Sequence, residues 1–162
     1  MTKRYFILLI FCFFTSCFIS CSKDGRYRKD DGHYGLHPAV AGSELYIYGG
    51  QKGNVFLGKL DASKYDTESI WNVYGSYGSK YNSKSIWNSY GTYGGKYGSY
   101  TPFNEYASYP PVLRNSKGQF CGYFTANKYM FNRADSKVAD IICEHYDEIR
   151  EDVSGWYEKI FR

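Results

Sequence analysis

The chain has 162 residues, with 20 lysines and arginines against 16 aspartates and glutamates, which gives a formal net charge of +4 at pH 7. This length suits one small domain with a single hydrophobic core. The charge does not indicate a nucleic-acid partner, because residues 43–134 hold ten basic and five acidic residues whereas residues 135–162 hold four basic and eight acidic. We expect instead that an acidic C-terminal helix packs on a basic central region.

Residues 1–21 have the pattern of an export signal, a short basic start followed by an apolar run over residues 5–14. The sequence Phe18-Ile19-Ser20-Cys21, followed by polar residues, resembles the lipobox of bacterial lipoproteins. That resemblance implies lipidation of Cys21, with Cys17 as the alternative, and a tether to the bacterial membrane on its periplasmic or cell-surface face. An ordinary signal peptide and an uncleaved anchor are the alternatives, although an anchor needs about 17 to 25 apolar residues.

Residues 22–42 contain alternating charges and four glycines without apolar periodicity, which predicts a flexible tether between lipid and domain. His33 and His37 lie in this segment. Two histidines four residues apart share a metal only when a helix places them on one face, and Gly35 and Pro38 argue against a helix there. We therefore predict no metal site and no cofactor.

Residues 43–134 are expected to form the main domain, and they contain a pattern that returns every 16 residues. Ser69-Ile70-Trp71-Asn72-Val73-Tyr74-Gly75 returns at residues 85–91 and, more loosely, at residues 101–107. Such tandem self-similarity predicts small structural units that bury their apolar sides against one another. The repeat resembles a group of uncharacterised bacterial exported proteins with the same Ser-Ile-Trp-Asn-x-Tyr-Gly units, and this resemblance implies a domain but no activity.

Each 16-residue unit is expected to contain one short helical turn, whose N-caps would be Ser69, Ser85 and Thr101. Single turns of helix are unstable in water, so their aromatic residues must pack across units. The expected core therefore consists of Ile70, Trp71, Tyr74 and their counterparts in the later units. Buried amides need partners, so the repeated asparagines are expected to form a ladder of side-chain-to-backbone hydrogen bonds: Asn72, Asn88 and Asn104.

Two β-hairpins are predicted on either side of the repeats, at residues 44–61 and 111–125, from apolar runs around Gly/Asn turns. Residues 56–65 also align with residues 120–129, at an offset of 64 residues, or four units of 16. The two hairpins should therefore resemble each other. Each contains a glycine that would allow a close backbone approach or a bulge: Gly58 and Gly122.

Residues 135–162 predict an amphipathic helix over 137–153, capped by Asp135 or Ser136, interrupted at Ser154-Gly155 and completed by a last turn. Its apolar stripe comprises Val138, Ile141, Ile142, His145, Ile149, Val153, Trp156 and Ile160. The expected fold is thus α+β, a small single domain in which two β-hairpins flank three 16-residue Tyr/Gly-rich repeat units with short helical turns, plus this C-terminal amphipathic α-helix. Cys121 and Cys143 form either one disulfide or two half-buried thiols.

Ten of the 19 tyrosines lie between residues 65 and 109, interleaved with lysines. Aromatic rings stack on sugar rings and hold cations, so we expect a non-catalytic binding module for cell-wall or surface polysaccharide. The candidate ligand residues are Tyr77, Tyr93, Lys80, Lys96, Tyr97 and Tyr100. The alternative is a structural or protein–protein interaction scaffold of the cell envelope. No catalytic motif is present, and we predict neither an enzyme nor a nucleic-acid partner.

Overall fold

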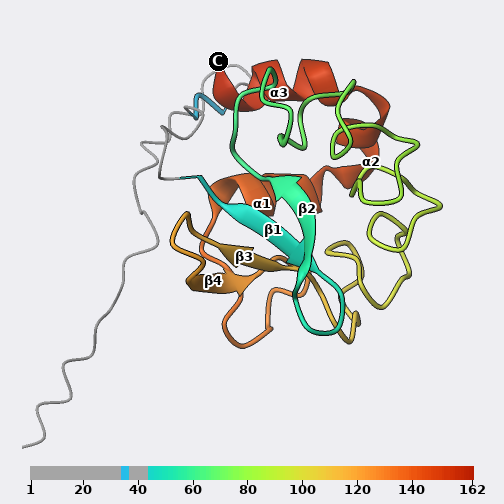
Figure 1. The fold of residues 1–162 in the computed structure, drawn as a ribbon, viewed down its shortest axis with the longest axis vertical. Coiled ribbons are helices and arrows are strands. Elements are labelled where there is room, and N and C mark those ends of the chain that lie inside the picture. Colours follow the sequence, from blue (N-terminus) through green and yellow to red (C-terminus); the bar gives the residue numbers. More distant parts are fainter. Residues whose placement is uncertain (1–33, 37–43) are drawn as a thin grey trace, which may run out of the picture.

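A computed structural model describes residues 34–36 and 44–162 (Figure 1). Its four short strands are β1 (Tyr46–Gly49), β2 (Val55–Lys59), β3 (Val112–Arg114) and β4 (Phe120–Tyr123). They form one antiparallel sheet in the order β2-β1-β3-β4, so the two predicted hairpins join through β1 and β3. Together with C-terminal helices, this sheet confirms a small α+β fold. The predicted signal segment and most of the predicted tether lie outside the described residues.

Both hairpins contain the bulge that their glycines were expected to allow. The pairing shifts between Ile47 and Tyr48 in the first hairpin and between Leu113 and Arg114 in the second. Gly58 and Gly122 adopt φ angles of 112° and 122°, which residues other than glycine rarely adopt. A Cβ on Gly122 would also lie 2.5 Å from the Cα atom of Ala134. Because these two glycines lack a side chain, a later segment of the chain can pass close to the edge strands β2 and β4.

The same pattern of backbone hydrogen bonds occurs in both halves of the sheet, at the expected offset of 64 residues. The N–H of Lys59 donates to the carbonyl of Glu68, and that of Tyr123 to the carbonyl of Asn132, both at 2.8 Å. The return bonds run from Ile70 to Lys59 and from Ala134 to Tyr123, at 3.1 and 2.9 Å. In each half, the turn that follows the hairpin thus comes back to cover part of the outer strand.

Residues 61–109 form a run of consecutive turns. The prediction of short helical turns in this segment is therefore wrong. The hydroxyls expected to cap helices accept instead from the N–H group two residues on, at 3.1 to 3.3 Å, in Ser69, Ser85 and Thr101. Each repeated asparagine donates to the carbonyl six residues back, at 3.0 to 3.2 Å, as the predicted ladder requires. Serine and asparagine side chains compete with helical hydrogen bonds, and here they specify turns.

Three helices follow: α1 (Lys137–Glu144), α2 (Tyr146–Glu151) and α3 (Val153–Phe161). Ser136 caps α1 as predicted. The predicted break at Ser154-Gly155 is wrong, because the helix is interrupted at His145 and Asp152 instead. The Asp152 carboxylate accepts from the N–H of Gly155 at 2.9 Å, and a Cβ on Gly155 would lie 2.1 Å from that carboxylate. Gly155 therefore belongs to the capped first turn of α3.

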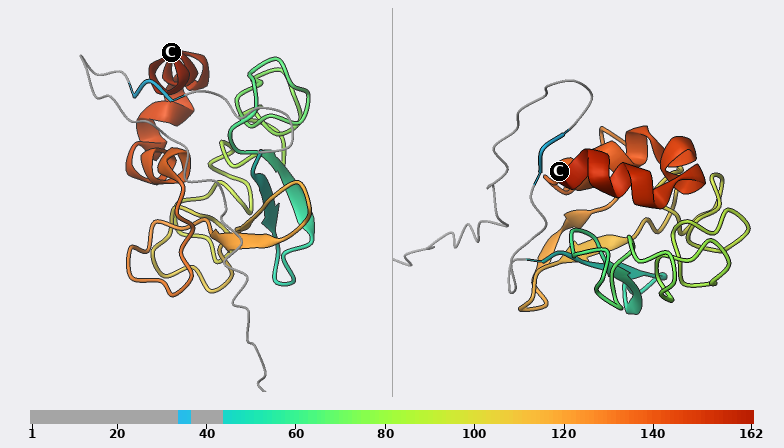
Figure 2. Two further views of the ribbon diagram at one scale, coloured as in Figure 1. Left: turned by 90° about the vertical axis from the view of Figure 1, so that its left-hand side faces the viewer. Right: turned by 90° about the horizontal axis from the view of Figure 1, so that it is seen from above.

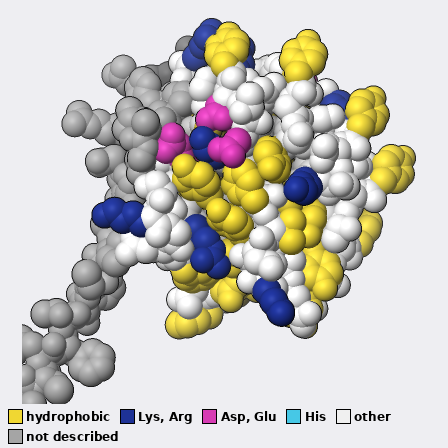
Figure 3. Space-filling model, viewed as in Figure 1, with side chains coloured by type: hydrophobic (Ala, Val, Ile, Leu, Met, Phe, Trp, Pro, Cys, Tyr) yellow, Lys and Arg dark blue, Asp and Glu magenta, His cyan; other side chains and the backbone are white. Residues whose placement is uncertain are grey.

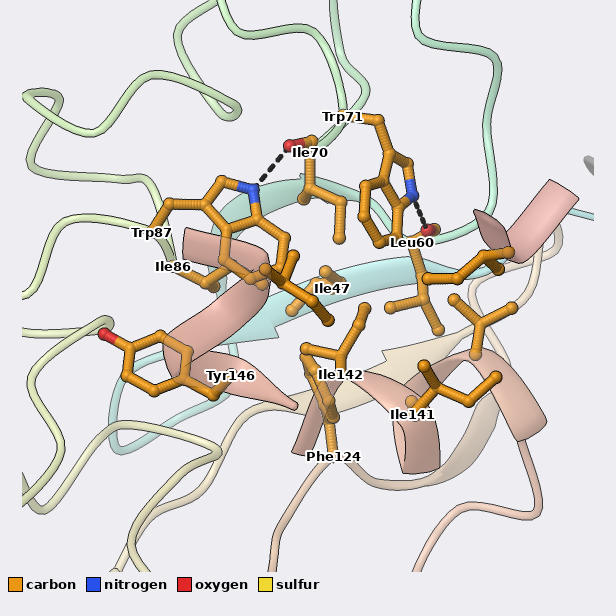
Figure 4. Packing of buried hydrophobic residues seen from close by; sticks show 14 of the residues in the cluster. Ile47, Leu60, Ile70, Trp71, Ile86, Trp87, Phe124, Ile141, Ile142 and Tyr146 are labelled. Atoms are coloured by element: carbon orange, nitrogen blue, oxygen red, sulfur yellow. Dashed lines mark hydrogen bonds between the residues drawn. The ribbon is translucent and has the colours of Figure 1, made fainter. Parts of the chain in front are cut away.

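The helices cover one side of the sheet, and the turns of residues 61–109 run past its edge to reach them (Figure 2). Trp71 and Trp87 stand side by side in the core between these parts, with ring centroids 5.7 Å apart (Figure 4). Their indole N–H groups donate to the carbonyls of Leu60 and Ile70 at 2.7 and 2.6 Å. Of the predicted stripe, His145 and Trp156 are only half-buried, and the rest is buried. Sequence analysis missed three buried aromatic residues of the helices: Tyr146, Tyr157 and Phe161.

Candidate functional site

Six tyrosines project from the repeat segment into solvent, each with 78% to 100% of its surface exposed. They form two series with a step of 16 residues, and we call them the outer tyrosines: Tyr65, Tyr81 and Tyr97 in the first series, Tyr74, Tyr90 and Tyr106 in the second. Figure 3 shows separate hydrophobic side chains standing out from the margin that this segment forms. Singly exposed apolar rings are common on protein surfaces, so the feature that distinguishes these six is their repetition every 16 residues.

The turns explain why these rings point outward. The N–H of Tyr74 donates to the Asn72 side chain at 3.2 Å, and the N–H of Tyr90 donates to Asn88 at 3.1 Å. These bonds fix the tyrosine backbone at the outer end of the turn, while the preceding isoleucine and tryptophan face the core. The prediction that Tyr74 is a core residue is therefore wrong, since it is 97% exposed. The ring has no role in holding the turn.

The lysines that precede the first series turn toward the helices. Lys96 pairs with Asp147 at 2.9 Å, and Lys80 lies 3.9 Å from the carboxylate of Glu151. A third pair joins Lys64 to Glu158. These ion pairs confirm that the acidic helices pack on the basic repeats, as the charge distribution predicted. The hydrogen bond that Lys96 donates to the Asp147 carboxylate raises the pKa of Lys96, and the one that Lys64 donates to Glu158 lowers the pKa of Glu158.

Most of the ligand residues predicted from the sequence serve other contacts. Tyr77 is half-buried edge-on against Phe56, with ring centroids 4.9 Å apart. Tyr93 packs over Gly49, where an added Cβ would lie 2.7 Å from the ring, and burial raises its pKa. Tyr100 stacks on Tyr109, and Lys80 and Lys96 join the ion pairs just described. Of the six, Tyr97 alone belongs to the outer tyrosines.

Sequence analysis missed five of the outer tyrosines: Tyr65, Tyr74, Tyr81, Tyr90 and Tyr106. A signal for each series was nevertheless present in the sequence. The first series directly follows a lysine that the helices bind, and the second follows the ladder asparagine by two residues. Both signals depend on knowing what the neighbouring residue contacts.

A shallow groove of about 400 Å³ lies where the repeats meet the junction of α2 and α3. One wall comes from residues 73–81 and includes Tyr74 and Tyr81, one ring from each series. The other wall comes from residues 151–154. Lys80 and Glu151 both line this groove, which we call the central groove.

Other charged side chains near the sheet form ion pairs or hydrogen bonds within the protein. Lys59 lies 2.9 Å from Asp66 and 3.3 Å from Glu68, and Asp61 accepts from the N–H of Leu45 at 2.8 Å. Burial raises the pKa of Asp61 to about 6. Within residues 34–36 and 44–162, no three histidines, cysteines or carboxylates are grouped so that they could hold a metal ion.

Cys143 is a free thiol, so the Cys121–Cys143 disulfide that the sequence allowed is not formed. Its sulfur lies 3.9 Å from the carbonyl oxygen of Pro102, and burial raises its pKa to about 12. Among the helices of the described part of the chain, none has the length and apolarity needed to cross a membrane.

Comparison of the chain with protein-family models, with curated proteins and with solved structures finds no match. The outer tyrosines and their surroundings are therefore the features from which a function can be inferred.

Proposed function

We propose that this protein is a non-catalytic binding module, tethered to the bacterial membrane by lipid, and that its outer tyrosines bind a cell-wall or surface polysaccharide. The single observation that carries the proposal is the presence of six exposed rings of one residue type at a constant step of 16 residues. A glycan polymer presents similar rings repeatedly along its length, so several exposed rings of one kind can contact it together.

The physical chemistry of tyrosine supports this ligand class. A phenol ring offers an apolar face to the C–H face of a sugar and a hydroxyl to its polar edge. A ring stack contributes about 1 kcal/mol, so one tyrosine binds weakly. Several rings on one scaffold raise the affinity for a long chain without any new kind of contact, because each later contact is intramolecular. The proposal therefore expects affinity to rise with glycan length.

The scaffold also fixes the backbone that carries the rings before a ligand arrives. The turns carry their own hydrogen-bond ladder, and Trp71 and Trp87 fix them to the core. Lys64 and Lys96 form close ion pairs with the helices, and Lys80 lies 3.9 Å from the carboxylate of Glu151. Binding should thus depend on ring contacts and not on long-range charge, and it should change little with salt.

The test is affinity electrophoresis of the full chain, solubilised in detergent, through gels that contain peptidoglycan fragments or capsular polysaccharide. Fluorescence is unsuitable because Trp71 and Trp87 are buried. A variant with Tyr74, Tyr90 and Tyr106 changed to alanine should lose most of its retardation. Phe131→Ala is the control, since Phe131 is 85% exposed but does not continue either tyrosine series. Equal retardation of the triple variant and the control would contradict the proposal.

A second candidate, a scaffold that binds another envelope protein, is favoured by the outer face of the sheet. There Phe56 lies between Tyr46, Tyr48 and Tyr77, with ring centroids 4.9 to 6.2 Å apart. Figure 3 shows a continuous hydrophobic area on the face of the molecule where the sheet lies. Cross-linking in intact cells separates the two candidates: a protein partner lost on Tyr48→Asp, but kept in the triple tyrosine variant, would favour the scaffold.

A further inference from the structure

We infer that the central groove is a subsite for one uncharged sugar unit, with Tyr74 and Tyr81 beside its ring and Lys80 and Glu151 bound to its hydroxyl groups. This inference rests on the proposed function and adds to it the place and the chemical class of one sugar. Three features of the groove carry it: its position, its donors and acceptors, and its charge.

The groove lies where the two series of outer tyrosines come next to the helices. Tyr74 and Tyr81, which are 97% and 91% exposed, both contribute to its lining. Its volume of about 400 Å³ lies within the range of about 300 to 1,000 Å³ that is usual for small-ligand sites. A sugar unit placed there would meet aromatic rings and polar groups together, whereas the other outer tyrosines offer mainly their rings.

Lys80 and Glu151 retain hydrogen-bonding capacity. The Lys80 ammonium donates to the backbone carbonyl of Glu151 at 3.1 Å, but it lies 3.9 Å from the carboxylate, which is too far for a hydrogen bond. An ammonium has three donors, so this contact leaves some of them available. The Glu151 side chain is 71% exposed, and its contact at 3.2 Å with Arg150 leaves acceptor sites open to solvent. Two neighbouring sugar hydroxyls can therefore bind, one accepting from Lys80 and the other donating to Glu151.

The charge of the groove selects against acidic sugars. Lys80 places a positive charge in the lining, and Glu151 and Asp152 place negative charges beside it. The two carboxylates outweigh the one ammonium, so an anionic sugar is repelled on balance. An uncharged sugar with adjacent hydroxyls meets no such repulsion and can bind to groups of both signs.

The next repeat supplies a matched control within the same chain. Tyr90, Tyr97 and Lys96 occupy the positions of Tyr74, Tyr81 and Lys80, 16 residues on. There the lysine donates directly to Asp147 at 2.9 Å. The ammonium of Lys96 and the carboxylate of Asp147 already bind each other, so a sugar hydroxyl would form a weaker contact with either group.

The test titrates the isotope-labelled full chain, in detergent, with the uncharged disaccharides cellobiose and chitobiose and with a disaccharide that contains glucuronic acid, and follows amide shifts by NMR. We expect the uncharged probes to shift residues of the groove. Tyr81→Ala and Glu151→Gln should weaken this binding at least tenfold. Phe131→Ala, which removes an exposed ring outside the groove, and Lys96→Met should leave it within about twofold. Unchanged amide shifts of the core in each variant show that the fold is intact.

Equal losses in the groove variants and in their matched controls would overturn the inference, as would tighter binding of the acidic probe. If the polymer is retarded in gels but no disaccharide shifts the groove, the subsite is refuted and the proposed function stands. If neither polymer nor disaccharide binds, both fail.

Discussion

The close packing of successive turns gives a sharp prediction at Gly94. A Cβ at this position would lie 2.3 Å from the carbonyl oxygen of Asn88 and 2.6 Å from that of Ile86. Both atoms belong to the backbone of the preceding turn, so no side chain can rotate to make room. The carbonyl of Gly94 also accepts a hydrogen bond from Tyr146 in α2. A shift of this turn would therefore disturb the contact between repeats and helices.

We expect Gly94→Ala to lower the free energy of unfolding by about 3 kcal/mol, the upper part of the usual range for overpacking. Gly98→Ala is the matched control, because the nearest atom to its added Cβ is 3.4 Å away. The control should change stability by less than about 1 kcal/mol in either direction. The assay is equilibrium urea unfolding followed by tryptophan fluorescence, since Trp71 and Trp87 are buried in the folded protein. If the two variants have the same unfolding free energy, the turns do not pack as described.

The remaining predictions concern ionisable groups. Burial raises the pKa of Asp61 from 3.8 to about 6, so its ionised form opposes folding above pH 6 and this cost disappears as the pH falls toward 4. Asp61→Asn should therefore raise the free energy of unfolding at pH 7 by about 2 kcal/mol, and urea titrations at pH 4 should show little difference. Cys143 should resist alkylation in the folded protein at neutral pH and react after unfolding, as peptide mapping would show; rapid labelling of native protein would contradict its burial and its pKa of about 12. A double-mutant cycle on Lys96→Met and Asp147→Asn should give a stabilising coupling that weakens as salt is added, and a coupling unaffected by salt would argue against their exposed ion pair.

Much of the local structure was predictable because its hydrogen bonds join residues that are close in sequence. The Asn72 side chain reaches the carbonyl six residues back and the N–H two residues on, and Asn88 repeats both contacts. The same holds for the hairpins, for the cap at Ser136 and for the bulges opposite Gly58 and Gly122. The sequence also placed Trp71 and Trp87 in the core, because large apolar residues recur there at each unit.

Two features of the structure were not predicted. Gly155 was predicted to interrupt a helix, but the carboxylate of Asp152, three residues earlier, makes it part of a cap; this signal is local in the sequence and was not recognised. The contacts of Lys80 and Lys96 with the acidic helices join residues some 50 to 70 positions apart, and no short stretch of sequence contains them. The charge asymmetry between the two segments indicated that such pairing would occur, but only the docked helices decided which lysine meets which carboxylate.

The 16-residue repeat and the asparagine ladder could be predicted from the sequence, because both depend on neighbours along the chain. Which tyrosines face the sheet, as Tyr77 does, and which face solvent, as Tyr74 does, depends on the packing of distant elements and could not be predicted. In a helix or a strand, the facing of a side chain follows a fixed period. A run of turns has no such period, so each ring is buried or exposed according to the element that happens to lie beside it.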